Sequence, residues 1–338
     1  MGISDTDLSA AEAGLLEWLA LGMHGEMDYM AKHGTKRSRP AELLPGTLRV
    51  ISLRMNGMPP DARDSWQVLE KGERAFISRY ALGRDYHKVM RNRLAKLAEK
   101  IRAEVAEFEG HHFEGRVFTD SAPVMEKELA RKAGLGWRGK HSLLLSREHG
   151  SRFFLGEIYV NLPLPADEPQ QEHCGTCTRC IDICPTQAIV APYRVDARRC
   201  ISYLSIELKG RIPAELRPLI GNRIYGCDDC QLICPWNGFA QVSTEPDFAV
   251  RHSLDDAGLI ELFAWDEAEF NSKLAGTAIY RIGHEQWLRN IAVALGNAPQ
   301  SVAVIAALES RAVHPSALVR EHVVWALARH TGSSGLFT

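Results

Sequence analysis

The sequence has few cysteines and no long hydrophobic run, and these two absences exclude several classes of protein. Only 8 of its 338 residues are Cys. The most apolar segment, IAVALGNAPQSVAVIAAL, is interrupted by Asn297, Pro299 and Gln300, so it falls short of the roughly 18 apolar residues of a membrane helix. The opening MGISDTDLSAAEAGLLEWLA has acidic residues and no basic segment, unlike a secretory signal. We therefore expect a soluble, cytoplasmic protein whose reduced cysteines bind metal rather than form disulfides.

The sequence also lacks a large excess of positive or negative charge, and it lacks a dinucleotide-binding fingerprint. The net charge is −2, so a nucleic-acid partner would have to be bound by a local basic patch. The glycines of AGLGWRGKH (Gly134, Gly136 and Gly139) follow a helical pattern rather than a strand, which argues against a dinucleotide site. We expect this turn instead to let the backbone approach a bulky ligand.

The cysteines that are present form the most specific motif. CGTCTRCIDICP has the spacing C-x2-C-x2-C-x3-C-P, which is typical of bacterial two-cluster ferredoxins, in which the fourth cysteine binds the other cluster. A second run, GCDDCQLICPW, lacks one cysteine, and Cys200 supplies it. If the last cysteine of each run binds the cluster of the other run, the sequence predicts two sets of [4Fe–4S] ligands. These are Cys174, Cys177, Cys180 and Cys234 for cluster one, and Cys200, Cys227, Cys230 and Cys184 for cluster two. Zinc knuckles or free buried thiols are the less specific alternative. No cysteine then remains as a nucleophile, and electron transfer is expected.

The order of helical and strand patterns predicts three parts. An α/β (α+β) domain is expected at residues 1–165, because strand patterns such as LRVISLRM alternate with helical ones such as YHKVMRNRLAKLAEKIRAEV. The proline-rich linker PLPADEPQQE leads into a double-cluster ferredoxin-like domain at 166–240. Residues 241–338 are expected to hold a polar connection, STEPDFAVRHSLDDAGL, and then helices.

The C-terminal helices carry a repeated pattern. EQWLRNIAVALGNAP and ALVREHVVWALARHTG resemble each other, and their arginines, Arg289 and Arg320, lie 31 positions apart. This spacing predicts HEAT-like repeats packed on the rest of the chain, with a plain helical bundle as the alternative.

Two basic runs and one aspartate are further candidates for chemistry. Each basic side chain is most simply a solvated surface charge, but the two runs together predict a phosphate-binding face. One run contains Lys32, Lys36, Arg37 and Arg39, and the other contains Arg131, Lys132, Arg138 and Lys140. Asp120 follows an apolar strand and precedes Pro123. Strand ends often carry catalytic groups, whereas a turn or capping aspartate is the structural alternative.

Taken together, these motifs resemble the epoxyqueuosine reductase family. The likeness covers nearly the whole chain and keeps the order of the segments GEMDYMAKHGTKRSRPAELLPGTLRVISL, LGRDYHKVMRNRL, FTDSAPVMEKELARKAGLGWRGKHSLLL, CGTCTRCIDICPTQAI, RCISYL and GNRIYGCDDCQLICPWN. Members usually begin with an additional helix and strand, so a shortened start is expected here, which leaves the first sheet edge in doubt.

The resemblance implies a cobalamin-binding N-terminal domain, a module with two [4Fe–4S] clusters, and a tRNA substrate whose wobble base is epoxyqueuosine. It implies that Asp120 is the proton donor and Lys209 a tRNA contact. The positions that match cobalamin contacts are Arg37, Ser78, Asp120, Leu144 and Leu155, with Ser202 and Asp229 as further candidates. An external low-potential electron donor, a monomer and no membrane partner are also expected.

The implied reaction is a two-electron removal of the epoxide oxygen, for which a cofactor must supply the electrons. Whether cobalt attacks carbon or only passes electrons stays open. A carboxylic acid beside a buried corrin is expected to have a raised pKa, which suits Asp120 as general acid. A reductive dehalogenase-like cobalamin enzyme acting on a small molecule, and a ferredoxin-type electron carrier that binds tRNA, are the two rival functions.

Overall fold

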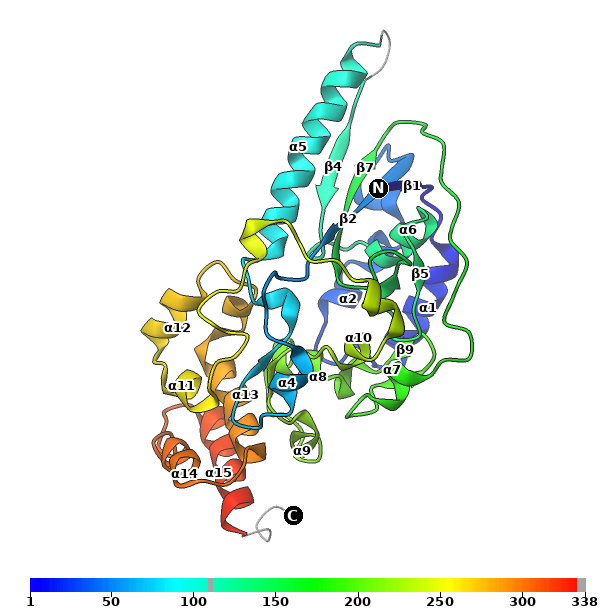
Figure 1. Cartoon of the computed structure of the whole chain (residues 1–338). Helices are drawn as coiled ribbons and strands as arrows, with labels where there is room; N and C mark the ends of the chain where they lie inside the picture. The colour runs from blue at the N-terminus through cyan, green and yellow to red at the C-terminus, as the bar shows by residue number, and fades with distance from the viewer. Residues whose placement is uncertain (109–111, 333–338) are drawn as a thin grey trace.

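The N-terminal part of the chain is built on a four-stranded antiparallel sheet. The computed structural model describes residues 1–108 and 112–332 and places the strands in the order β1-β2-β7-β4 (Figure 1). Their bounds are Gly2–Ser4 for β1, Arg49–Asn56 for β2, Phe153–Val160 for β7 and Gly115–Phe118 for β4. The three longer strands lie where the sequence predicts them, and β1 forms the sheet edge that the sequence left in doubt.

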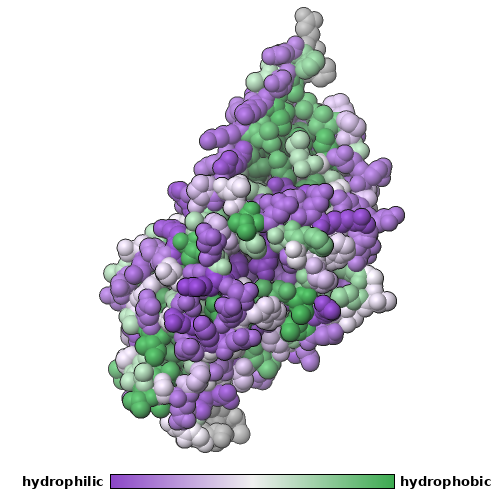
Figure 2. Space-filling model, viewed as in Figure 1, coloured by the Kyte–Doolittle hydropathy of each residue, from purple (hydrophilic) through white to green (hydrophobic). Residues whose placement is uncertain are grey.

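One helix covers each face of this sheet, because apolar side chains alternate along its strands. On one face Ile51 and Ile158 pack against Leu94 and Ala98 of α5 (Tyr86–Ala106). The outer part of this face is only partly buried, and Figure 2 shows an apolar area beside α5. The opposite face packs against α6 (Glu126–Lys132).

Glu157 is a buried exception to the apolar pattern of β7. Its side chain is fully buried, and both carboxylate oxygens lack a hydrogen-bond partner among the described residues. Burial, together with Glu126 and Asp120, raises the pKa of Glu157 well above its ordinary value. The neutral acid is therefore the form that the fold accommodates.

We expect Glu157→Gln to flatten the pH dependence of stability. Because the folded-state pKa is raised, the native protein loses stability as pH rises above the unfolded value of about 4.3, at up to about 1.4 kcal/mol per pH unit. Glutamine keeps the shape and removes this loss. Urea denaturation should show a larger gain in stability for the variant at pH 8 than at pH 5, and the exposed Glu104→Gln should show no such difference. Equal pH dependence in the variant and the native protein would mean that Glu157 is ionised in the fold.

A second core joins segments that are far apart in the sequence. Strand β3 (Phe76–Ile77) pairs in parallel with β10 (Arg223–Tyr225), and Ile77 and Ile224 share one hydrophobic cluster with Leu204, Leu259 and Ile291. The first half of the chain, the cysteine-bearing region and the C-terminal helices are therefore packed together. The segment 243–259 contributes Phe248 and Leu254, both buried. The expectation that it is merely a polar connection is wrong.

The C-terminal helices pack mainly on one another and on β10. These are α11 (Leu259–Ala264), α12 (Glu267–Leu274), α13 (Gly283–Asn297), α14 (Val302–Glu309) and α15 (Ala317–Thr331). The two arginines of the repeated pattern have different roles. Arg289 is fully buried and donates to the carbonyl oxygens of Leu204 and Leu208, whereas Arg320 donates to the loop carbonyl of His314. A HEAT-like repeat stays a prediction.

The remaining elements are mostly short. The helices are α1 (Ser9–Ala20), α2 (Tyr29–Lys32), α3 (Pro40–Leu43), α4 (Ser65–Leu69), α7 (Arg179–Asp182), α8 (Ile201–Ile206), α9 (Arg217–Ile220) and α10 (Asp229–Leu232). The short strands are β5 (Trp137–Arg138), β6 (Leu144–Leu145), β8 (Ile189–Ala191) and β9 (Arg194–Val195), and the 3-10 turns are η1 (Gly34–Arg37), η2 (Arg79–Ala81), η3 (Ala197–Arg199), η4 (Pro235–Phe239), η5 (Pro246–Phe248) and η6 (Ile279–Ile282). Within residues 1–108 and 112–332, no helix has the length and apolarity needed to cross a bilayer.

Candidate active site

The eight cysteines line two separate cavities of about 370 Å³ each. Cavity one contains Cys184, Cys200, Cys227 and Cys230, and cavity two contains Cys174, Cys177, Cys180 and Cys234. This grouping places each run's last cysteine with the other run, as the crossed ligand sets require. No three His, Cys, Asp or Glu side chains of the described residues lie close enough to hold a single metal ion. A cluster of four irons takes its thiolates from a wider ring, which fits cavities of this size.

The thiols of each set also perturb one another. Burial, together with the neighbouring thiols of Cys234, Cys174 and Cys177, raises the pKa of Cys180 to about 11. Burial likewise raises the pKa of Cys200, and its thiol neighbour is Cys184. Thiols with raised pKa values are protonated at neutral pH, so they bind as thiolates when a positively charged group compensates them. An iron–sulfur cluster supplies that charge, and the residues present fit it.

Cavity one also brings together three of the predicted cofactor contacts, Ser78, Ser202 and Asp229. The Asp229 carboxylate is already held by Arg223, at 2.6 and 2.8 Å. The Ser78 hydroxyl is bonded to Asp228, a lining residue that the sequence analysis did not identify. The polar side chains of Ser78 and Asp229 are therefore already held by hydrogen bonds within the protein.

Two other residues of cavity one test whether it suits a polar ligand. Among the described residues, Arg79 Nη1 and His141 Nε2 are buried without a partner. His141 Nδ1 accepts from the Leu143 amide at 3.1 Å, and burial lowers the pKa of His141 to about 4, so its neutral ring carries the proton on Nε2. Two unused donors and aromatic walls from Tyr86 and Phe154 fit a large amide-bearing cofactor such as cobalamin.

The remaining predicted cofactor contacts are not in the lining of this cavity. The side chains of Leu144 and Leu155 are buried in the hydrophobic cluster that contains Ala130 of α6. A ligand would therefore contact the backbone atoms of these two leucines. Arg37 is buried, and its Nε atom lacks a partner among the described residues. Burial lowers the pKa of Arg37, and the nearby Asp120 opposes that shift, which places the guanidinium near the aspartate.

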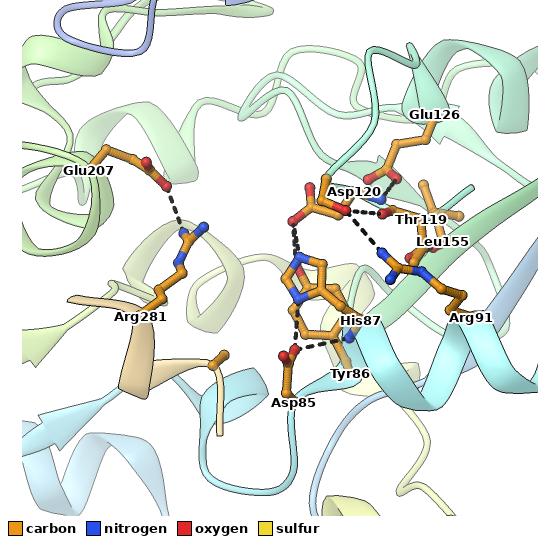
Figure 3. Close-up of polar contacts among 12 residues, drawn as sticks. Asp85, Tyr86, His87, Arg91, Thr119, Asp120, Glu126, Leu155, Glu207 and Arg281 are labelled. Carbon is orange, nitrogen blue, oxygen red and sulfur yellow. Dashed lines mark hydrogen bonds and ion pairs between the residues drawn. The ribbon is translucent and has the colours of Figure 1, made fainter. Parts of the chain in front are cut away.

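Asp120 lies at the centre of a polar network at the end of β4 (Figure 3). Its Oδ2 atom accepts from the Tyr86 hydroxyl at 2.5 Å and contacts His87 Nε2 at 2.9 Å. Its amide donates to Glu126 Oε2 at 3.0 Å. The backbone of Asp120 has a φ of 43°, a left-handed conformation that is uncommon outside glycine. With 46% of its side chain exposed, Asp120 is held by neighbours and still accessible.

The charges around Asp120 correct the expectation of a raised pKa. Burial does raise the pKa of Asp120, but hydrogen bonds from His87 and Tyr86 outweigh it and hold the pKa below its ordinary value. Burial raises the pKa of Glu126 to about 7, assisted by the charge of Asp120. Burial lowers the pKa of His87, but Asp120 and Asp85 more than offset this and raise it to about 9. At neutral pH the proton therefore resides on His87 rather than on Asp120.

Charged groups from the C-terminal half surround the accessible side of Asp120. Arg281 of η6 pairs with Glu207 at 2.6 Å, and Figure 3 shows this pair across from Asp120. Lys209 is exposed two residues beyond Glu207, where its ammonium donates to Gln286 at 3.1 Å. The predicted tRNA contact is thus close in the chain to the rim of the site.

Two sequence-based expectations about this region can be compared with the structure. A Cβ atom at Gly136 would lie 1.9 Å from the Leu145 carbonyl oxygen, so this glycine permits the close pairing of β5 and β6. In the second basic run, Arg131 pairs with Glu128 and Lys132 with Asp5. These internal ion pairs weaken the case for a phosphate-binding face there.

Sequence reasoning missed the residues that hold Asp120. Asp85 caps the first turn of α5 by accepting from the His87 amide at 3.1 Å, and Tyr86 and His87 follow it. A capping aspartate before a helix is a recognisable signal. The sequence gives no sign, however, that the first turn of α5 faces the end of β4, because that contact depends on tertiary packing.

Comparison with known proteins identifies the family. A family model described as "Epoxyqueuosine reductase QueG, DUF1730" matches residues 37–121, and a "4Fe-4S double cluster binding domain" model matches residues 173–237. The chain is 64% identical to the epoxyqueuosine reductase of Xanthomonas campestris, over 97% of this chain and 91% of that protein. It is 60% identical to that of Escherichia coli, over 97% and 85%.

Solved structures give the same result. A crystal structure of epoxyqueuosine reductase with an epoxyqueuosine-modified tRNA-Tyr stem loop matches with a TM-score of 0.86 at 28% identity, covering 97% of this chain and 85% of that one. A Bacillus subtilis epoxyqueuosine reductase with its catalytic aspartate loop swung out of the active site matches with a TM-score of 0.84 at 28% identity, covering 97% and 86%. On its sequence and its fold, this chain belongs to the epoxyqueuosine reductase family.

Proposed function

We propose that this chain reduces epoxyqueuosine to queuosine at the wobble position of tRNA, with electrons delivered through two [4Fe–4S] clusters to bound cobalamin. The single observation that carries the mechanism is the lining of cavity one. The second cysteine set and the predicted cofactor contacts Ser78 and Ser202 share this cavity. An electron on cluster two would therefore reach a cofactor in the same cavity without crossing a protein wall.

The order of electron transfer follows from the two cavities. Cys177 of cavity two is exposed, whereas all four cysteines of cavity one are half-buried. An external low-potential donor would therefore reduce cluster one first, and cluster one would reduce cluster two. His141 lines both cavities and lies between them.

The chain's own residues bind and orient the reactants. Cobalamin, when bound, supplies the two electrons that break the epoxide carbon–oxygen bonds. Ser78, Ser202, Arg79 and His141 would hold it from cavity one, with Leu144 and Leu155 contributing backbone. Asp120 would pass protons to the departing oxygen, because its carboxylate is the accessible group at the end of β4.

An anaerobic single-turnover assay tests this function. Reconstituted enzyme with cobalamin should convert epoxyqueuosine-containing tRNA to queuosine-containing tRNA, and the same enzyme without cobalamin should not. No conversion of the tRNA, together with no binding of cobalamin, would favour a ferredoxin-type carrier. Turnover of an aryl halide with no reaction of the tRNA would favour a reductive dehalogenase-like enzyme.

We propose that the three parts of the chain, residues 1–165, 166–240 and 241–338, have separate roles. The first part would bind cobalamin, the second would hold the clusters, and the HEAT-like helices of the third would support the tRNA side. The packing of α8 against the buried Arg289 of α13 supports this arrangement, because it ties the cluster region rigidly to the C-terminal helices. We propose that the enzyme acts as a monomer in the cytoplasm.

Neutralising Lys209 should weaken tRNA binding. A lysine that contacts phosphate releases a counterion, so Lys209→Gln should lower affinity and reduce the slope of log K against log salt by about one. Fluorescence anisotropy with a labelled anticodon stem loop between 50 and 200 mM salt measures both, and cobalamin absorbance should not change. Lys100→Gln, on the outer half of α5 (Figure 1), is the matched control. An unchanged slope in Lys209→Gln would remove Lys209 from the interface.

A further inference from the structure

The reaction needs more protons than Asp120 holds. Converting an epoxide to an alkene breaks two carbon–oxygen bonds, and the oxygen takes up two protons to leave as water, while two electrons arrive from the external donor through the clusters and cobalamin. Asp120 carries at most one proton, and hydrogen bonds from His87 and Tyr86 favour its ionised form. Another group must therefore hold a proton close to it.

His87 is placed between two carboxylates. Its Nδ1 atom lies 2.7 Å from Asp85 Oδ1, and its Nε2 atom lies 2.9 Å from Asp120 Oδ2 (Figure 3). Ionised carboxylates only accept hydrogen bonds, so both ring nitrogens must donate, and this requires the imidazolium form. Because burial is outweighed by hydrogen bonds that lower the pKa of both Asp85 and Asp120, the two carboxylates are ionised, and the contact geometry then assigns a second proton to the ring.

The surroundings fix this ring in place. His87 stacks on Tyr86 with ring centroids 4.1 Å apart, and Tyr86 stacks on Phe154 at 4.2 Å. Only 17% of the His87 side chain is exposed, so exchange with bulk water is restricted. Asp120 Oδ2 accepts the hydrogen bonds of both Tyr86 and His87, so Oδ1 takes part in neither of these contacts.

We propose that His87, oriented by Asp85, is a positioning residue that supplies Asp120 with the proton that Asp120 passes to the departing epoxide oxygen. The proton moves from His87 Nε2 to Asp120 Oδ2, and a proton then leaves Asp120 for the substrate oxygen. His87 becomes neutral and takes a proton from solvent, so the same relay delivers the second proton that completes the water, and His87 is recharged again before the next turnover. This inference rests on the proposed reduction of epoxyqueuosine.

The other charged groups near His87 are compatible with this role. Asp85, Tyr86, Lys88 and Arg91 lie on the first turns of α5, Asp120 lies at the end of β4, Glu126 at the start of α6, and Arg281 in η6. The two carboxylates in direct contact outweigh the burial that lowers the pKa of His87, which reaches about 9. The single-turnover rate should therefore be constant through neutral pH and fall as pH rises through about 9.

Two substitutions distinguish proton supply from support of the structure. Asp85→Asn removes one of the two charges on His87, so the alkaline fall in rate should move to lower pH by about 1–3 units. His87→Gln keeps one hydrogen bond to Asp120 but carries no proton, so the rate should fall roughly 10–100-fold, short of the 10²–10⁴-fold typical of a direct acid, and the alkaline fall should disappear. His112→Gln, whose ring lies 3.5 Å from Glu114 on the surface, is the control.

Histidine NMR gives a reading that does not depend on turnover. In the complete enzyme with selectively labelled histidine, one ring resonance absent from His87→Gln should titrate near pH 9, and in Asp85→Asn it should titrate lower. An unshifted alkaline fall in Asp85→Asn, or a His87 ring that is neutral at pH 7, would overturn the inference. The native enzyme could leave epoxyqueuosine unreacted while the His87 ring still titrates near pH 9. That result would contradict the proposed reaction but not the protonated state of His87 beside Asp120.

Discussion

Replacing Cys184 with serine should destroy the cluster of the other cysteine run and leave the cluster of its own run intact. Cys184 lines cavity one with Cys200, Cys227 and Cys230, and none of its own run's first three cysteines is there. Loss of this ligand should remove roughly half of the iron. It should also abolish turnover, because cluster two is the one that shares a cavity with the cofactor contacts.

The comparison needs no prior assignment of spectra to clusters. Low-temperature EPR of the reduced protein is recorded for four variants. Cys184→Ser should give the spectrum of Cys200→Ser, and Cys234→Ser should give the spectrum of Cys177→Ser. If Cys184→Ser instead resembles Cys177→Ser, the ligand sets follow the sequence runs and the crossed arrangement is wrong.

The cysteine motif shows what local sequence can predict. Its spacing is a covalent constraint on which thiols can reach one cluster, so the two groups of cysteines in cavities one and two could be anticipated without a structure. The strands β2 and β7 and the helix α5 were predictable for a similar reason, because their apolar periodicity reports which face is buried.

The environment of Asp120 shows what local sequence cannot predict. Its ionisation depends on His87, which lies 33 positions earlier in the chain, and on Glu126 at the start of the next helix. Neither contact follows from periodicity or spacing. Burial alone suggested a raised pKa, and only the packing of the first turn of α5 against the end of β4 reveals that hydrogen bonds reverse the shift.

Asp120→Asn should lower the rate of conversion by about 10²–10⁴-fold, the usual loss when a positioned acid is removed. Asparagine is nearly isosteric and tolerates the left-handed backbone at this position. Folding, both clusters and cobalamin absorbance should therefore be preserved. The amide cannot pass a proton, and it no longer stabilises the charge on His87. The loss should appear in single-turnover formation of queuosine, while reduction of bound cobalamin by the clusters continues.

Asp61→Asn is the matched control, because Asp61 also has a positive φ, of 57°, but is exposed and outside cavity one. It should react at the native rate. If Asp120→Asn also reacts at the native rate with cobalamin bound, Asp120 only shapes the turn after β4. Glu126 would then be the nearest alternative acid, since its pKa of about 7 keeps part of it protonated at neutral pH and its carboxylate lies 3.0 Å from the Asp120 amide.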